Sequence, residues 1–228
     1  MSTAPPDLPR DEAKCVAPIP VPTYGAGGVF AVACSTTIAG PALSCLEKVL
    51  DLSSYGAWNT FVPRASVIAA PGGGGDDDDD GNNSNNSKND LPVVAPELRD
   101  LASRPGYVAP GAKIRFDAVM TPGGASSRAV HLEVTSLEAF FDDDDDGKKR
   151  KGYRVVWKAI GFPRFLLHSE RVQEFVEGVA ADGTAVETRY ACWETFGGLL
   201  GYVLPRARIE SGFQRWMDGL KKVVEETK

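Results

Sequence analysis

Apolar residues recur with two different periods in the last third of the chain. Two runs with the alternation of a β-strand, residues 169–178 and 185–196, flank Asp182 and Gly183, a pair typical of a two-residue hairpin turn. After a Gly-Gly bend, apolar residues recur at the spacing of a helix: Ile209, Phe213, Trp216, Met217, Leu220, Val223 and Val224. A hairpin followed by a long amphipathic helix predicts that one helix face is buried against a sheet.

The two-residue turn fixes the register of this hairpin. It places Arg171 opposite Glu194, and Phe175 opposite Tyr190. One pair joins opposite charges and the other joins two aromatic rings, and both kinds of pair stabilise a sheet. A turn that is one residue longer would instead bring Glu170 opposite Glu194, which are like charges. We therefore predict the register that a two-residue turn produces.

The rest of the chain supplies further strands and two short helices. Residues 41–50 have helical spacing after Pro41, and residues 53–61 form an aromatic-rich turn or second short helix. The strand-like runs are residues 28–38, 63–70, 113–120, 130–140 and 153–160. The prediction is an α+β fold with two short helices after the first strand. A curved antiparallel sheet of about six to seven strands surrounds the long C-terminal helix.

Composition divides the chain into a body and three weakly patterned segments. Residues 1–27 are rich in Pro and Gly and predict a flexible N-terminal tail that lies partly along the domain surface. Residues 28–228 are predicted as a single domain with low-complexity acidic insertions at about 71–110 and 141–152. Two aspartate runs in these insertions supply ten negative charges, so without them the formal net charge of −6 would be +4. The body is therefore close to neutral.

The sequence contains no motif for metal, cofactor or nucleotide chemistry. Its four cysteines form no CxxC pair and match no zinc spacing, so we expect reduced structural thiols. There is no HExxH, GxSxG or P-loop, and His131 and His168 lie in no recognisable catalytic motif. We expect no metal, no cofactor and no nucleic-acid partner. The N-terminus shows no targeting pattern, and no run approaches the roughly 18 apolar residues of a membrane span, which predicts a cytoplasmic protein.

Three stretches resemble the SRPBCC superfamily, which includes the START domains, the polyketide cyclase/dehydrases and the coenzyme Q-binding START proteins. They are residues 36–41 (TTIAGP), residues 55–63 (YGAWNTFVP), and residues 183–198, in which Gly-Thr precedes Tyr190 and the run WETFGG. The resemblance covers about residues 28–228. It implies the helix-grip fold, with a cavity for a hydrophobic ligand between the sheet and the long helix. It implies no catalytic residues, because the superfamily contains both carriers and enzymes.

The predicted register and the helical stripe identify the residues that would line this cavity. They are Arg171, Gln173, Phe175, Tyr190, Cys192, Glu194 and Phe196 from the hairpin, and Phe213, Trp216, Met217 and Leu220 from the helix. A buried Glu194 needs a partner, which the register supplies as Arg171. The pair either orients a polar group of a ligand or is a structural cross-strand pair, and Glu194 is also the one candidate for a general base. An ordinary solid core is the alternative to a cavity.

Trp58, Leu200 and Tyr202 are predicted at the mouth of the cavity. The resemblance places Trp58 there, and the apolar stretch 199–204 either gates the cavity, makes a transient membrane contact or folds onto the sheet. We therefore expect binding or carriage of a small hydrophobic ligand such as a lipid, a quinone or a polyketide-like molecule. The alternatives are an enzyme of the polyketide cyclase/dehydrase kind that uses the same cavity, and a protein with only an interaction role.

Overall fold

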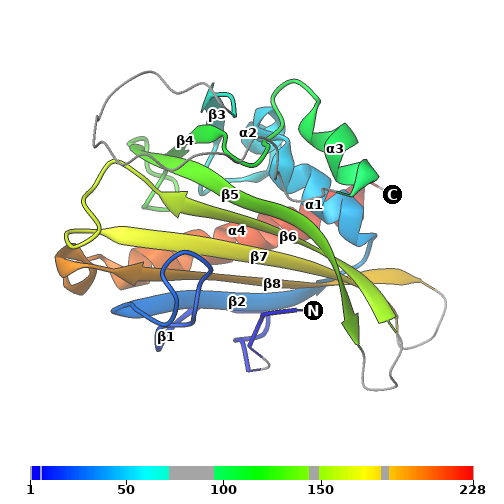
Figure 1. Cartoon of the computed structure of the whole chain (residues 1–228), viewed down its shortest axis with the longest axis horizontal. Helices are drawn as coiled ribbons and strands as arrows, with labels where there is room; N and C mark the ends of the chain where they lie inside the picture. Colours follow the sequence, from blue (N-terminus) through cyan, green and yellow to red (C-terminus); the bar gives the residue numbers. More distant parts are fainter. Residues whose placement is uncertain (1, 6, 72–94, 144–148, 181–184, 228) are drawn as a thin grey trace, which may run out of the picture.

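The computed structural model describes residues 2–5, 7–71, 95–143, 149–180 and 185–227 (Figure 1). Within these residues, eight strands form one antiparallel sheet in the order β1-β2-β8-β7-β6-β5-β4-β3. The strands are β1 (Lys14–Val16), β2 (Phe30–Ile38), β3 (Arg64–Ala69), β4 (Lys113–Ala118), β5 (Arg128–Asp143), β6 (Lys149–Ala159), β7 (His168–Val179) and β8 (Val186–Gly197). The helices are α1 (Ala42–Leu50), α2 (Tyr55–Trp58), α3 (Pro96–Ala102) and α4 (Arg206–Glu226), with 3-10 turns η1 (Leu52–Ser54) and η2 (Leu199–Tyr202).

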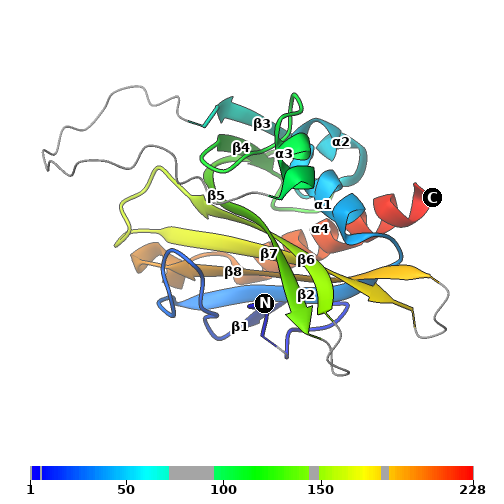
Figure 2. The same cartoon turned by 45° about the vertical axis from the view of Figure 1, so that its right-hand side comes forward.

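The long helix α4 lies across one face of the sheet, and the sheet curves around it (Figure 2). The two predicted short helices, α1 and α2, follow β2. Both contact α4. A curved antiparallel sheet that holds a C-terminal helix is the helix-grip fold, so the predicted fold class is confirmed. The sheet has eight strands where six to seven were expected, because β1 adds an edge strand that pairs with β2.

The hairpin register is the predicted one. Arg171 pairs with Glu194, and Phe175 pairs with Tyr190, in the antiparallel ladder between β7 and β8. Residues 182 and 183, the predicted turn, lie outside the described residues. Because side chains alternate along a strand, this register determines which residues of both strands face α4.

The sheet buries side chains on both faces. The face toward α4 carries the main core, and the opposite face carries a smaller one. The smaller core contains Ala31, Ala33, Val156, Val172 and Trp193 from the sheet, covered by Ile19 and Val21 from the N-terminal segment. The predicted tail therefore contains a strand and two buried apolar residues, and much of it packs against the sheet.

Two fully buried carboxylates tie this segment to the sheet. Glu170 accepts hydrogen bonds from the backbone nitrogen and the hydroxyl of Thr23, both at 2.7 Å. Glu174 accepts from the backbone nitrogen of Thr3 at 2.9 Å and pairs with Arg154 at 2.7 Å. A buried carboxylate needs such donors, so the N-terminal segment satisfies polar groups of the sheet as well as covering it.

Both predicted insertions contain regular structure within their described residues. The strands β5 and β6 extend to Asp143 and Lys149, so most of the segment 141–152 is a continuation of their hairpin. The segment 71–110 contains α3, whose Leu98 and Leu101 are buried against the main core. The first aspartate run, residues 76–80, lies outside the described residues.

We expect Gly219→Ala to destabilise the protein. In an exposed helix, Ala is more favourable than Gly by about 1 kcal/mol. A Cβ at position 219, however, would overlap the backbone oxygen of Trp58, which a side-chain rotation cannot relieve. The clash should outweigh the helix preference and lower the free energy of unfolding by about 1 to 3 kcal/mol. Chemical denaturation of the full chain measures the change, with the exposed Lys222→Ala as the control; an increase in stability would contradict this packing.

Candidate functional site

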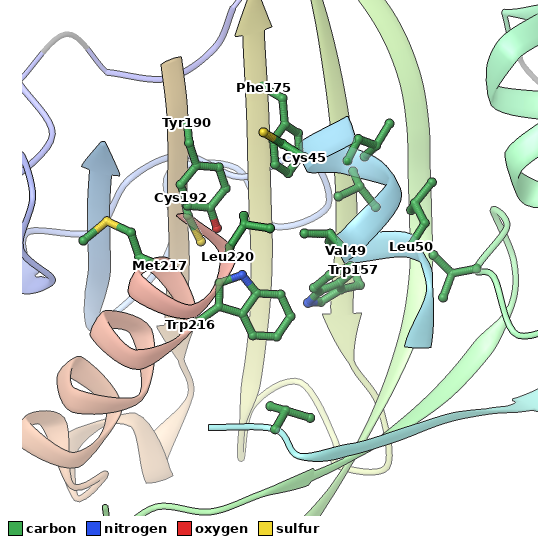
Figure 3. Close-up of a cluster of buried hydrophobic side chains, with 14 of the residues drawn as sticks. Cys45, Val49, Leu50, Trp157, Phe175, Tyr190, Cys192, Trp216, Met217 and Leu220 are labelled. Carbon is green, nitrogen blue, oxygen red and sulfur yellow. The ribbon is translucent and has the colours of Figure 1, made fainter. Parts of the chain in front are cut away.

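The predicted cavity-lining residues converge on one side of the sheet. Alternate residues of β7 and β8 point toward α4, and the apolar stripe of α4 points back at them (Figure 3). Every member of the predicted set is buried: Arg171, Gln173, Phe175, Tyr190, Cys192, Glu194, Phe196, Phe213, Trp216, Met217 and Leu220. Residue spacing in the sequence therefore predicted side chains that are buried on the same side of the sheet.

Arg171 and Glu194 form a buried ion pair in this core. The Nε and Nη2 atoms of Arg171 donate to the same carboxylate oxygen of Glu194, at 2.9 and 2.8 Å. The guanidinium also lies over the ring of Phe213 at 4.1 Å and near the ring of Trp216 at 5.2 Å. Burial opposes the charge of Arg171, but the Glu194 carboxylate outweighs it and holds the pKa of Arg171 above its ordinary value.

A second polar pair lies beside the first. The hydroxyl of Tyr190 donates to the side-chain oxygen of Gln173 at 2.8 Å, and both residues are fully buried. Burial raises the pKa of the Tyr190 phenol well above its ordinary value. Tyr190 therefore stays protonated and remains a hydrogen-bond donor. Because the amide oxygen of Gln173 accepts this bond, its amide nitrogen is directed to another position.

Five buried nitrogen donors make no hydrogen bond within the described part of the chain. They are Trp58 Nε1, Asn59 Nδ2, Arg171 Nη1, Gln173 Nε2 and Trp216 Nε1. Each unsatisfied buried donor costs about 1 to 3 kcal/mol, and native proteins contain few of them. All five are donors, so the group that each of them lacks is a hydrogen-bond acceptor such as an oxygen atom. Sequence reasoning named four of the five residues as cavity residues but could not show that their donors are unpaired.

The space between the sheet and α4 is occupied by a cluster of aromatic rings. Trp216 packs against Tyr55, Trp58, Phe116 and Trp157, with ring centroids 5.4 to 6.2 Å apart. Figure 3 shows Trp216 and Trp157 between α4, α1 and the sheet. The prediction did not include Tyr55, Phe116 or Trp157. Each lies in a predicted element, but only the tertiary fold brings these elements to Trp216.

The two cavities described for this structure lie outside the predicted set. A cavity of about 510 Å³ is on the opposite face of the sheet, between the N-terminal segment and strands β2 and β8. A more open cavity of about 700 Å³ lies between η1, α2, β3 and β4. Neither is lined by a residue of the predicted set. Neither of these two cavities therefore reaches the unpaired donors.

The predicted mouth residues lie in two places. Trp58 is 7% exposed and packs against Trp216 within the core. Tyr202 is 71% exposed on η2, and Leu200 beside it is partly buried.

In the described parts of the chain, no three His, Cys, Asp or Glu side chains are grouped so that they could hold a metal ion. The helices described here include none with the length and apolar character needed to cross a membrane.

No protein-family model matches the chain. Among curated proteins it is similar to the oxopyrrolidines biosynthesis cluster protein O of Penicillium oxalicum, with 28% identity over 190 residues, 81% of this chain and 78% of that protein. A solved hypothetical protein from Helicobacter pylori aligns with a TM-score of 0.50 and 12% identity, over 89% of this chain and 91% of its own. A START superfamily protein from Mycobacterium smegmatis aligns with a TM-score of 0.44 and 11% identity, over 87% and 99%. The first of these structural similarities concerns the fold alone.

We expect Arg171→Met to lower the free energy of unfolding by about 3 to 5 kcal/mol, because it leaves the Glu194 carboxylate buried without its cation. The double variant Arg171→Met/Glu194→Leu should recover most of that loss, since no charge then remains in the core. Lys158→Met, which breaks the partly exposed pair with Glu133, should cost no more than about 1 kcal/mol. Denaturant titrations of the three variants measure these values. A double variant as unstable as Arg171→Met would show that packing, not charge, governs the site.

Proposed function

We propose that the protein binds a small, mainly apolar molecule that carries oxygen acceptors, between the sheet and α4. The single observation that carries this proposal is a set of buried donors that have no hydrogen-bond partner among the described residues. Three of them, on Arg171, Gln173 and Trp216, belong to residues of the β7–α4 interface. A carbonyl, hydroxyl or carboxylate oxygen held there would accept hydrogen bonds from them while the rest of the ligand contacts apolar side chains.

The aromatic cluster indicates how space for the ligand would arise. The Trp216 indole makes no hydrogen bond to the described residues, so its position depends on ring packing alone. We place the ligand where this ring now lies, and its entry then requires Trp216 to move aside. A ligand can stabilise such an open conformation by the difference in its affinity for the two states. Met217 beside it is an unbranched side chain that adapts readily to a changed neighbour.

The biosynthetic relative supports a ligand with carbonyl oxygens. Its name places it in a gene cluster for oxopyrrolidines, which are rings that carry a carbonyl oxygen. An intermediate of this chemical kind matches the donor set, because it combines apolar surface with oxygen acceptors. We therefore propose an intermediate of natural-product biosynthesis as the ligand class, in place of a purely hydrocarbon lipid.

An enzyme that uses the same residues is the second candidate. Tyr190 is a protonated donor and Glu194 a carboxylate acceptor, and both point from β8 toward α4. A donor and an acceptor on one wall could move a proton during ring closure or loss of water. Native mass spectrometry of protein purified from its own host would identify a co-purified ligand. If the wild type converts this molecule, and Glu194→Gln binds it equally well without converting it, the protein is an enzyme.

A matched pair of probes tests the binding proposal. The probes 2-acetylnaphthalene and 2-ethylnaphthalene have similar shapes and differ in one carbonyl oxygen. We expect the ketone to bind about tenfold more tightly, since it accepts a hydrogen bond from a charged donor. Its binding should quench tryptophan fluorescence, because Trp58, Trp157 and Trp216 all lie in the aromatic cluster.

Two variants serve as the test and its control. Arg171→Met/Glu194→Leu removes a donor without leaving a buried charge and should abolish the preference for the ketone. Trp193→Phe changes a tryptophan on the opposite face, whose Nε1 donates to the oxygen of Pro20, and should retain that preference. Equal affinity of the two probes for the wild type, or no binding of either, would refute the proposed site.

A further inference from the structure

Large apolar side chains gather at one end of the molecule, away from the candidate site. Ten such residues are exposed in the described parts of the chain, and five of them lie on two adjoining segments. We call these five the apolar tip: Phe162, Phe165, Leu199, Tyr202 and Val203, which are 49 to 74% exposed. The turn between β6 and β7 and the segment between β8 and α4 lie side by side there, at the left-hand end in Figures 1 and 2.

The apolar tip is held in place by backbone contacts. The nitrogen of Leu199 donates to the oxygen of Phe165, and the nitrogen of Leu200 donates to the oxygen of Leu166, both at 2.9 Å. Gly198 lets the two segments approach, because its φ is +84° and a Cβ there would lie 2.7 Å from the backbone of Leu166. These backbone contacts therefore hold the two segments against each other and keep the five exposed side chains at one end of the molecule.

The two segments that form the apolar tip carry only positive charge, although the chain as a whole carries a formal net charge of −6. The acidic residues that follow these segments, Glu170 and Glu210, are hydrogen-bonded to the N-terminal segment. The segments 160–168 and 197–209 contain three exposed arginines, Arg164, Arg206 and Arg208, and no acidic residue. Two of these guanidinium groups lie over aromatic rings, Arg164 over Tyr24 at 5.2 Å and Arg206 over Phe30 at 4.6 Å. The cations are thus fixed beside the exposed apolar side chains.

The charge and shape of the apolar tip indicate which kind of partner binds it. A second copy of the chain would bring three arginines against three arginines, which like-charge repulsion disfavours. The tip side chains also project from turns, and neither described cavity is lined by them. A lipid interface matches these side chains. Apolar groups such as Phe, Leu and Val enter the acyl boundary there, Tyr lies at the headgroup level, and the Arg cations contact anionic headgroups. We propose that the apolar tip docks the protein on the surface of an anionic membrane.

Flotation of the full chain with lipid vesicles tests this proposal, which does not rest on the proposed ligand site. The wild type should bind vesicles of phosphatidylcholine that contain about 30% phosphatidylserine. Its affinity for vesicles of phosphatidylcholine alone should be about tenfold lower. Raising the salt to about 0.5 M should remove most of that preference. Phe165→Ser/Tyr202→Ser should lower binding at least about tenfold, because two large apolar groups no longer enter the interface.

Matched variants separate docking from general surface hydrophobicity. Phe141→Ser/Val186→Ser removes two comparably exposed residues from strand ends away from the tip and should leave binding unchanged. Arg164→Gln/Arg208→Gln should remove the preference for anionic vesicles, and it provides the test if the serine variant does not fold. Equal binding to neutral and anionic vesicles, an equal loss in the tip and control variants, or a wild-type dimer that the tip variant abolishes would each overturn the proposal.

Discussion

The register between β7 and β8 is the constraint on which the rest of the structure depends. A shift of one residue would move every side chain of one strand to the other face of the sheet. In the observed register, Arg171 and Gln173 face α4, while Glu170 and Glu174 face the N-terminal segment. Arg171 and Gln173 bond to side chains on the face toward α4. Glu170 and Glu174 bond to the N-terminal segment on the opposite face. The hairpin thus determines both the composition of the main core and the path of the N-terminal segment.

The register buries the Arg171–Glu194 ion pair, and such a pair contributes little net stability to a core. Apolar residues of similar volume commonly stabilise a core as well as a buried ion pair or better, because desolvation of the two charges is costly. Here Glu194 and the ring of Phe213 offset part of that cost, yet one guanidinium nitrogen of Arg171 has no hydrogen-bond partner in the described part of the chain. A core built for stability would contain fewer open donors. This imbalance is the physical reason for preferring a binding role to a purely structural one.

The sequence allowed prediction of those parts of the fold that depend on local periodicity. The hairpin register and the apolar stripe of α4 are encoded by residue spacing and by complementary cross-strand pairs. The buried Ile19 and Val21 were missed because single apolar residues between prolines show no period. The strand β1 was missed because its 3 residues are too few to show one. The N-terminal donors to Glu170 and Glu174, Thr23 and Thr3, lie more than 140 residues away in the sequence. No local pattern predicts such pairing, and for the same reason Phe165 was not grouped with Tyr202 before the fold was known.

The candidate site and the apolar tip share the helix α4. Its first turn carries Arg206 and Arg208, and Trp216 follows ten residues after Arg206, about 15 Å along the helix axis. Movement of Trp216 away from the aromatic cluster would require its backbone or its rotamer to change. A contact that fixes the first turn at a lipid surface would restrain the first of these changes and not the second. Membrane docking and ligand entry are therefore coupled only if α4 moves as a rigid body, whereas a rotation of the Trp216 side chain would leave the two events independent.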